Sequence, residues 1–298
     1  MRKSIKMAVF AGAACACMAG AGMSVKAADK VAINEKNFAP AVMEYAQNAD
    51  TNEDGFLSSK EASKVKKMRF DTRQYIDSFQ GVKYFTGLKK FIYEVAEYQQ
   101  DMTAAPDLDL SGMDKLEKVT IYSESMHIGT INLQNCTKLQ QLALIPDSEH
   151  MIYVDGINLQ GCTNLDSFIC GGQTDQIDLS GLKKLEDVMF TGETETLNLD
   201  RCSKLKNIYI ISDTLKTLSL KGVRKLKGIT VKAPSLESLD LSKNKKLKNV
   251  NCHYTQITSL DLSGNKDLKY LHCQNNRKLT SLDVTGCTSL RYLRCHNT

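Results

Sequence analysis

The chain has 298 residues, with 39 Lys and Arg against 34 Asp and Glu, ten Cys, four Pro and no Trp. Its length suits one or two domains, and 42% apolar with 24% charged residues excludes a wholly disordered chain. The charge is unevenly spread. Residues 101–200 carry 5 positive and 17 negative charges, a net of −12, whereas residues 201–298 carry 19 positive and 6 negative, a net of +13. Such a difference in sign between two halves bears on the partners that a protein attracts.

Residues 1–27 have the layout of a secretory signal peptide. Arg2, Lys3 and Lys6 precede an uncharged stretch rich in Ala and Gly, and small residues follow up to Ala27. A retained anchor or a lipidated Cys is the alternative, but the stretch is weakly hydrophobic and no lipobox Leu is present. We therefore expect a secreted, extracellular protein, with cell-surface association open, and no transmembrane segment after cleavage. The remaining chain has 39 − 4 = 35 basic against 34 acidic residues and is nearly neutral.

A twelve-residue stretch that starts at Asp50 matches the EF-hand calcium loop at each defining position. Carboxylate, amide and hydroxyl side chains recur at alternate positions, Gly55 permits the sharp turn, and Glu61 closes the loop as a two-oxygen ligand. The alternative is an ordinary polar turn. The predicted cofactor is one Ca²⁺, bound with a dissociation constant on the order of 0.1–1 mM as for extracellular modules. The predicted ligands are Asp50, Asn52, Asp54, the backbone carbonyl of Phe56, Ser58 and Glu61.

Apolar residues flank this loop at helical spacing. They are Val42, Tyr45, Ala46 and Ala49 before it, and Ala62, Val65 and Met68 after it. The pattern predicts a small helical, EF-hand-like cap over residues 28–78. A second copy of the loop is lacking, which argues against a dockerin.

The rest of the chain, residues 79–298, is built from copies of one short repeat. Leu239-Asp-Leu-Ser, Leu260-Asp-Leu-Ser and Leu282-Asp-Val-Thr begin successive copies, and another Leu stands eight residues after each start. The spacing between copies runs from 20 to 28 residues and is 20–22 in the later ones, as in leucine-rich repeat solenoids. The eight-residue offset defines a column, with a degenerate first member at Leu88, made of Leu116, Leu139, Leu165, Leu185, Leu205, Leu226, Leu247, Leu268 and Leu290.

Each repeat is expected to add one parallel strand to a continuous sheet. In the run from Leu268 to Asn276, Leu271 and Cys273 are two residues apart and point inward, whereas Tyr270 and His272 point outward. The predicted fold is an α/β solenoid, a right-handed leucine-rich repeat superhelix. Its concave parallel sheet has about ten strands, and a small helical cap precedes it.

The eight cysteines after residue 27 fall at two repeat positions. An exported chain with an even number of Cys would ordinarily suggest disulfides. These cysteines instead exchange with Ile, Leu, Phe and Val, so we expect buried free thiols packed as small core residues. Cys170, Cys252, Cys273 and Cys295 share the inward strand position, and Cys136, Cys162, Cys202 and Cys287 lie five residues after the repeat start.

The chain resembles the internalin-type leucine-rich repeats of bacterial surface proteins, especially those with cysteine ladders. The resemblance covers roughly residues 38–298 and is most specific in the Leu-x-x-Leu-x-Cys-x-x-Asn run that ends at Asn276. It implies a helical cap related to an EF-hand and a binding role without catalysis. The Asn that normally recurs at the turn survives only at Asn276, and wall-sorting and immunoglobulin-like segments are lacking. Surface attachment and receptor binding therefore do not carry over.

The outward strand positions form the predicted ligand-binding surface, since solenoids bind on their concave side. A patch of exposed apolar and aromatic residues marks an interaction site, although strand propensity alone also places such residues. The predicted surface comprises Ile145, Ile169, Met189, Tyr209, Ile211, His253, Tyr270, His272, Tyr292 and Arg294. The ligand would be a protein or a glycan. Three histidines, His253, His272 and His296, are expected to face the same way, as solvated side chains rather than zinc ligands.

Basic residues repeat in register outside the strands. Lys221, Arg224, Lys225 and Lys227 recur as Lys243, Lys245, Lys246 and Lys248. They predict a positive stripe on the convex or flanking side, either a solubilising face or a site for an anionic polymer. Nucleic acid is excluded as a partner by the predicted export and by the lack of a recognition motif.

These features favour a secreted, non-catalytic recognition or adhesion module with a calcium-stabilised cap. One alternative is a structural cell-envelope protein that associates with itself, acidic half to basic half. The other is a hydrolase with an unrecognised site. Inward-pointing cysteines cannot serve as nucleophiles, and the scattered carboxylates form no pair that can be placed in one cleft.

Overall fold

The computed structural model describes residues 49–52, 57–72, 76, 78–79, 81–95, 105–123, 126–147 and 151–298. The predicted signal peptide, most of the predicted cap, and two predicted calcium ligands, Asp54 and Phe56, lie outside these residues.

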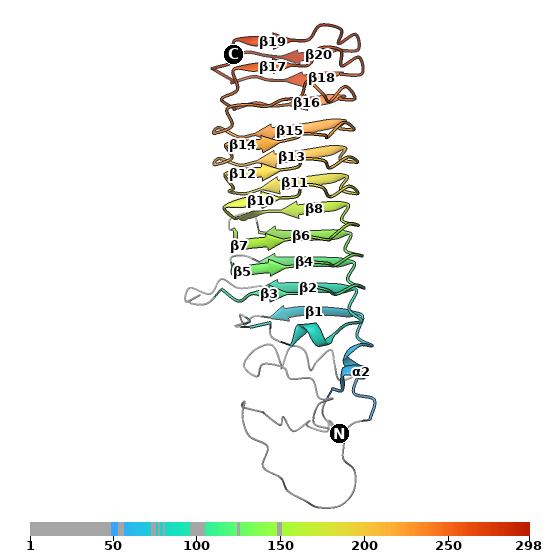
Figure 1. Cartoon of the computed structure of the whole chain (residues 1–298). Coiled ribbons are helices and arrows are strands. Elements are labelled where there is room, and N and C mark those ends of the chain that lie inside the picture. The colour runs from blue at the N-terminus through green and yellow to red at the C-terminus, as the bar shows by residue number, and fades with distance from the viewer. Residues whose placement is uncertain are drawn as a thin grey trace, which may run out of the picture.

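One parallel sheet of 11 strands, the long sheet, forms one side of an elongated column (Figure 1). Its strands are stacked in chain order, and the column is nearly straight, so the predicted concave surface is the outer face of this sheet. The strands are β1 (Lys67–Thr72), β2 (Lys90–Val95), β4 (Lys118–Ser123), β6 (Gln141–Pro146), β8 (Ser167–Cys170), β11 (Asp187–Thr191), β13 (Asn207–Ile211), β15 (Gly228–Lys232), β16 (Asn249–Asn251), β18 (Tyr270–His272) and β20 (Tyr292–Arg294).

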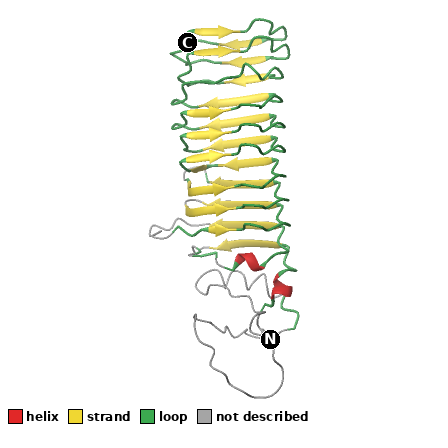
Figure 2. Ribbon diagram, viewed as in Figure 1, coloured by secondary structure: helices red, strands yellow, loops and turns green. Residues whose placement is uncertain are grey.

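Three shorter parallel sheets line the opposite side of the column (Figure 2). The first contains β3 (Leu108–Asp109), β5 (Met126–Asn132), β7 (Ile152–Asn158) and β9 (Gly172–Gln173). The second contains β10 (Gln176–Asp178), β12 (Thr196–Asn198) and β14 (Thr217–Ser219), and the third contains β17 (Ser259–Asp261) and β19 (Ser281–Asp283). The predicted solenoid is confirmed, but its second side is strand rather than helix. The only helices among the described residues are α2 (Ser59–Ala62) and the 3-10 turn η2 (Val82–Tyr84).

The interior between the two sides is a continuous apolar core. Every member of the predicted Leu column from Leu88 to Leu268 is fully buried, and Leu290 in the last repeat is partly buried. Burial of a Leu side chain contributes about 1.5–3 kcal/mol relative to leaving it exposed. Because each repeat covers only its neighbours, this stabilisation depends on stacking.

The Leu-Asp-Leu-Ser signature encodes a turn on the side of the column opposite the long sheet. The Asp240 and Asp261 carboxylates accept hydrogen bonds from the backbone N–H groups of Ser242 and Ser263, at 2.9 and 2.8 Å. Such a bond favours a turn over strand continuation. In the repeat of Asp261, Gly264 follows with φ +71°, a left-handed conformation that suits glycine. The signature therefore fixes the path of the chain toward the long sheet.

The solenoid begins earlier than the sequence pattern predicted. Met68 was expected on a helix after the calcium loop, but α2 ends at Ala62 and Met68 lies fully buried in β1. Strand β1 pairs along its whole length with β2. Ala62, Val65 and Met68 are three residues apart, which fits a short helix. A pattern of only three residues also fits a chain that leaves the helix and enters a strand.

The junction between α2 and the first repeats is close-packed. The aromatic rings of Phe79 and Tyr93 meet edge to face at 5.3 Å, and the Tyr93 hydroxyl accepts a hydrogen bond from the backbone N–H of Ile76 at 3.1 Å. A Cβ at Gly87 would lie 1.7 Å from the carbonyl oxygen of Ser63, so only glycine fits there. These contacts attach α2 to the start of the solenoid.

Candidate functional site

Outward side chains on the long sheet form three parallel rows. The strand register places the middle row along Ile92, Thr120, Ala143, Ile169, Met189, Tyr209, Thr230, Asn251, His272 and Arg294. The first row lies two residues earlier in each strand, and the last row lies two residues later. Neighbours within a row are about 4.8 Å apart, close enough for one ligand to contact several.

The predicted binding residues divide among these rows. Ile169, Met189, Tyr209, His272 and Arg294 belong to the middle row. The first row holds Tyr270 and Tyr292, whereas Ile145 and Ile211 belong to the last row. The sequence pattern predicted that these side chains share the outer face of the sheet, but it did not predict that they fall in three different rows.

An open groove of about 660 Å³ runs across the outer face of the long sheet from β8 to β18. Five of the predicted residues line it, namely Ile169, Met189, Tyr209, Tyr270 and His272. Met189 and Tyr209 remain 43% and 39% exposed despite their apolar character. The other five predicted residues, Ile145, Ile211, His253, Tyr292 and Arg294, do not line the groove.

Differences in side-chain size create the groove. Gly228 and Thr230 on β15 present little or no side chain, so they form its floor. Tyr209 rises from β13 on one side, and Tyr270 and His272 rise from β18 on the other. A large apolar residue at Gly228 or Thr230 would fill this space.

Polar residues that the sequence prediction missed also line the groove. They come from the ends of β8, β11, β13 and β16. The Asn207 amide donates a hydrogen bond to the Asp187 carboxylate at 2.7 Å. The strand alternation that placed Met189 and Tyr209 outward also places the residues two positions earlier outward, so this signal could have found them. The polar residues are Ser167, Asp187, Asn207, Asn249 and Asn251.

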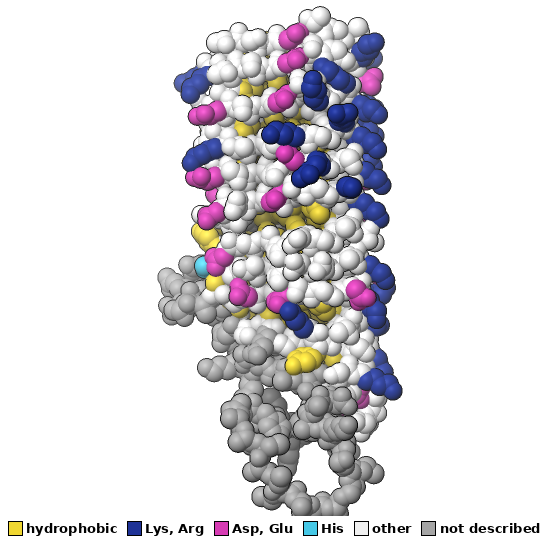
Figure 3. Space-filling model, viewed as in Figure 1, with side chains coloured by type: hydrophobic (Ala, Val, Ile, Leu, Met, Phe, Trp, Pro, Cys, Tyr) yellow, Lys and Arg dark blue, Asp and Glu magenta, His cyan; other side chains and the backbone are white. Residues whose placement is uncertain are grey.

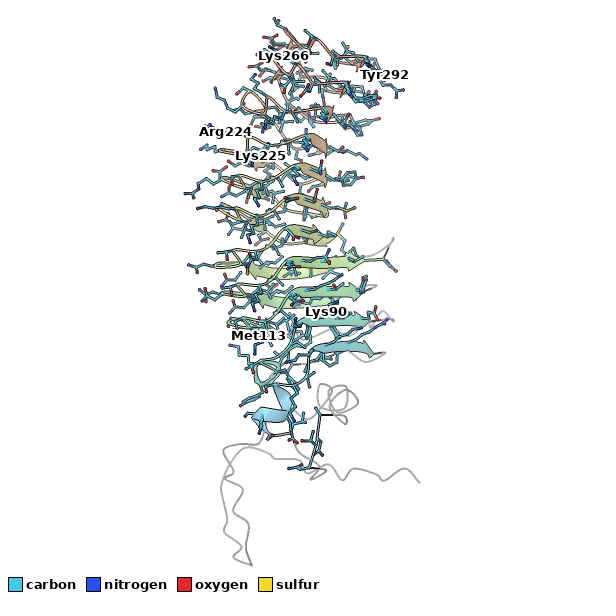
Figure 4. All side chains as sticks on the ribbon, turned by 90° about the vertical axis from the view of Figure 1, so that its right-hand side faces the viewer. Lys90, Met113, Arg224, Lys225, Lys266 and Tyr292 are labelled. Atoms are coloured by element: carbon cyan, nitrogen blue, oxygen red, sulfur yellow. The ribbon has the colours of Figure 1, made fainter. Side chains whose placement is uncertain are left out.

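At one end of the groove, two tyrosines of the first row are stacked, Tyr270, which lines the groove, and Tyr292, which does not. The Tyr270 and Tyr292 rings lie 4.9 Å apart between centroids and are nearly parallel, at 3°. Tyr292 is more than half exposed and projects at the right-hand edge of Figure 4. Flat aromatic surfaces of this kind suit planar or ring-shaped ligand groups.

The three histidines lie in two rows, His272 in the middle row and His253 and His296 two residues after middle-row positions. His272 is paired in register with Asn251, whereas His253 lies two residues after Asn251 and bonds to its side chain at 2.6 Å. Burial, followed by the nearby charges of Lys232 and His272, lowers the pKa of His253. Within the part of the chain that the structure describes, no group of three His, Cys, Asp or Glu side chains is placed to hold a metal ion.

The eight described cysteines are all free thiols. Six are buried, Cys287 is half-buried and Cys295 is exposed. Burial raises the pKa of Cys162 and Cys170 to about 12 and that of Cys273 to about 11. The prediction of buried free thiols is therefore confirmed for six positions, and none of these six is placed to act as a nucleophile.

Four of the six predicted calcium ligands are described, namely Asp50, Asn52, Ser58 and Glu61. Ser58 is the N-cap of α2 and forms a reciprocal capping box with Glu61. The Glu61 carboxylate also accepts two hydrogen bonds from Thr51, from its backbone N–H and its hydroxyl, both at 2.8 Å. It thereby joins the start of the loop to its end. Hydrogen bonds from Ser58, and then from Thr51, lower the pKa of Glu61 to about 2.

The chain is similar to solved leucine-rich repeat proteins of bacteria. The functional domain of InlJ from Listeria monocytogenes, which includes a cysteine ladder, matches 86% of this chain and 64% of its own length, with 16% identity and a TM-score of 0.43. Internalin C2 of Listeria monocytogenes matches 85% of this chain and 89% of its own, with 13% identity and a TM-score of 0.36.

A leucine-rich repeat protein of Leptospira interrogans matches 80% of this chain and 92% of its own length, with 11% identity and a TM-score of 0.30. Internalins, the proteins that the sequence resembles, are among the solved structures that the chain is similar to. No protein-family model matches the chain, and no curated protein matches it in sequence. Among the described residues, no helix is long and apolar enough to cross a membrane.

Proposed function

We propose that this chain is a secreted recognition module without catalytic activity, and that it binds a protein partner in the groove on the long sheet. The observation that carries the proposal is the juxtaposition of exposed Met189 and Tyr209 with Tyr270 and His272 across a floor of small residues. Large exposed apolar side chains in one patch are typical of interaction sites, and aromatic residues dominate binding energy at protein interfaces.

Asp187, Asn207 and Asn249 add hydrogen-bonding side chains to the apolar lining of the groove. Interfaces combine an apolar centre with hydrogen-bonding groups at the rim, and these side chains supply both donors and acceptors beside the apolar residues. A glycan ligand is the second candidate. It is favoured by the same amides and by the flat Tyr270 ring.

The test is a double substitution, Met189→Asp and Tyr209→Asp. Both side chains are substantially exposed, so the melting temperature should change little, whereas partner capture from a surface-protein and glycan array should be lost. A matched control carries Thr217→Asp and Thr258→Asp, exposed positions away from the long sheet. Unchanged capture by the groove variant, or equal loss in the control, would show that the ligand binds elsewhere.

We also propose that the Asp50–Glu61 loop binds Ca²⁺ and stabilises the N-terminal cap. Support comes from the Glu61 carboxylate, which is ionised at neutral pH and faces the start of the loop. Each Glu61 carboxylate oxygen can accept two hydrogen bonds, and in this structure each accepts one from a backbone N–H and one from a hydroxyl. A bound calcium ion would replace the two hydroxyl donors, those of Thr51 and Ser58.

Calcium at ten times its dissociation constant should stabilise the folded chain by about 1.4 kcal/mol. The measurement is a calcium titration by calorimetry and by thermal unfolding, with the chelated protein as reference. Glu61→Gln should abolish both the binding heat and the shift in melting temperature, whereas exposed Glu237→Gln should leave both intact. A calcium response that survives Glu61→Gln would place the ion outside this loop.

A further inference from the structure

One edge of the long sheet carries an unbroken ladder of cations. The residue directly before the strand is basic in five successive repeats, and these five residues are joined rung to rung by backbone hydrogen bonds. The N–H of Lys227 donates to the carbonyl of Lys206 at 2.8 Å, and the bonds continue in the same way to the last member. The ladder consists of Lys206, Lys227, Lys248, Lys269 and Arg291.

The ladder ends sharply where acidic residues take over the same position. Lys206 pairs with Glu186 of the preceding repeat at 2.5 Å. Beyond that pair, Lys227, Lys248, Lys269 and Arg291 make no ion pair with any part of the chain that the structure describes. The five cations therefore span about 19 Å at a rung spacing of about 4.8 Å, and within the described chain only Lys206 has a carboxylate to offset their mutual repulsion.

A second column of cations widens this edge. Lys204, Lys225 and Lys246 lie two residues before the ladder positions and are all exposed. Figure 3 shows Lys and Arg side chains along the right-hand edge of the column. Figure 4 faces that edge and labels Arg224, Lys225 and Lys266 on it. The result is a straight basic strip, parallel to the solenoid axis.

We propose that this strip binds an acidic polysaccharide, extended along the axis of the solenoid. A straight row of evenly spaced cations matches a linear polymer with repeating carboxylate or sulfate groups better than it matches a compact ligand. The stacked Tyr270 and Tyr292 rings directly follow Lys269 and Arg291 in sequence. They offer flat surfaces to sugar rings at the end of the strip, which a phosphate polymer would not use. The lysine ladder and Tyr292 do not line the groove, and Tyr270 is the one residue that the two sites share, so this proposal does not depend on the function proposed for the groove.

The experiment uses a heparin oligosaccharide as the probe and polyphosphate as the competing polymer, both with the full chain. The triple variant Lys227→Gln, Lys248→Gln and Lys269→Gln should bind heparin at least tenfold more weakly, and the wild-type affinity should fall steeply with salt. The charge-matched control, Lys64→Gln, Lys216→Gln and Lys278→Gln, removes three exposed lysines elsewhere and should bind as wild type. Tyr292→Ala should weaken binding of heparin but not of polyphosphate.

Each outcome decides the proposal. Equal loss in the two triple variants, or affinity that does not respond to salt, overturns the site. Tighter binding of polyphosphate than of heparin, or a Tyr292→Ala effect on both polymers alike, overturns the assignment to a polysaccharide. Thermal unfolding of the two triple variants, which both retain exposed polar side chains, confirms that the comparison is made on folded protein.

Discussion

Asn276 is fully buried in the turn that follows β18, and its side chain makes four hydrogen bonds. Its amide donates to the carbonyls of Cys252 and Cys273 at 2.7 and 2.9 Å, and its oxygen accepts from the N–H and hydroxyl of Thr255 at 2.7 and 2.9 Å. One side chain thus satisfies polar groups of two successive repeats.

Asn276→Ala should destabilise the folded chain by about 2–4 kcal/mol, because it leaves several buried backbone groups without partners. The measurement is urea unfolding followed by circular dichroism. The control is Asn249→Ala, an exposed Asn on β16, which should change the free energy of unfolding by less than about 0.5 kcal/mol. If both variants lost the same free energy of unfolding, the four hydrogen bonds of Asn276 would not stabilise the fold.

At the scale of the repeat element, cysteine serves as more than a small apolar residue. The Cys136, Cys162 and Cys202 thiols each donate to a backbone carbonyl of the preceding repeat at 3.1 Å. Asn244 holds the equivalent position in a later copy and donates to the carbonyl of Val223 at 2.8 Å. The sequence pattern showed the cysteine column but not this bond, although Asn244 and Asn265 at the same position could have indicated a donor there. A thiol tolerates burial here because it is a weak donor that a carbonyl can satisfy.

These buried thiols should make the protein sensitive to alkali. Their pKa values are raised in the folded state, to about 12 at Cys170, whereas unfolded thiols titrate near pH 8.5. The folded chain therefore keeps protons that the unfolded chain releases, so stability is full below about pH 8.5 and falls as the pH rises above it. Each buried thiol should contribute a loss of about 1.4 kcal/mol per pH unit.

The free energy of unfolding between pH 8 and 11, measured on reduced protein, provides the check. Cys170→Ala should reduce the loss of unfolding free energy per pH unit by the contribution of one buried thiol. Cys295→Ala, at an exposed position, should leave that slope unchanged. An identical slope in these two variants would contradict the assignment.

At the scale of the whole molecule, the sequence predicted what strict repetition encodes. The Leu column and the inward strand positions follow from a constant eight-residue offset and from strand alternation, so residues such as Leu205 and Ile210 were placed correctly. Strand β1 was missed because it precedes the repeats and has no Leu signature. The groove floor was missed because Gly228 and Thr230 act through the absence of a side chain, which a search for large residues does not detect.

The opposed charges of the two halves also raise the question of self-association. The ladder position is acidic or neutral from Glu117 to Glu186 and basic from Lys206 onward, so an antiparallel second copy would match it. The neighbouring column does not support this arrangement, because Lys115, Lys138 and Lys184 keep it basic in the acidic half as well. In the register that pairs Glu117 with Arg291, two such copies would place Lys184 against Lys225 and Lys204 against its own copy at the centre of the contact, although Lys138 would meet Asp267. Complementarity in one column is thus opposed by repulsion in the next.

We therefore expect the chain to be monomeric at both low and high salt. Size-exclusion chromatography with light scattering at about 20 and 500 mM NaCl measures this, because a charge-driven dimer forms only where the Debye length exceeds the contact distance. Replacing one repulsive lysine by Lys184→Glu, which would then face Lys225 of the second copy, should create a dimer at low salt that dissociates at high salt. A wild-type dimer with that same salt response would instead favour the structural, self-associating role, with the basic strip occupied by a second copy rather than by a polysaccharide.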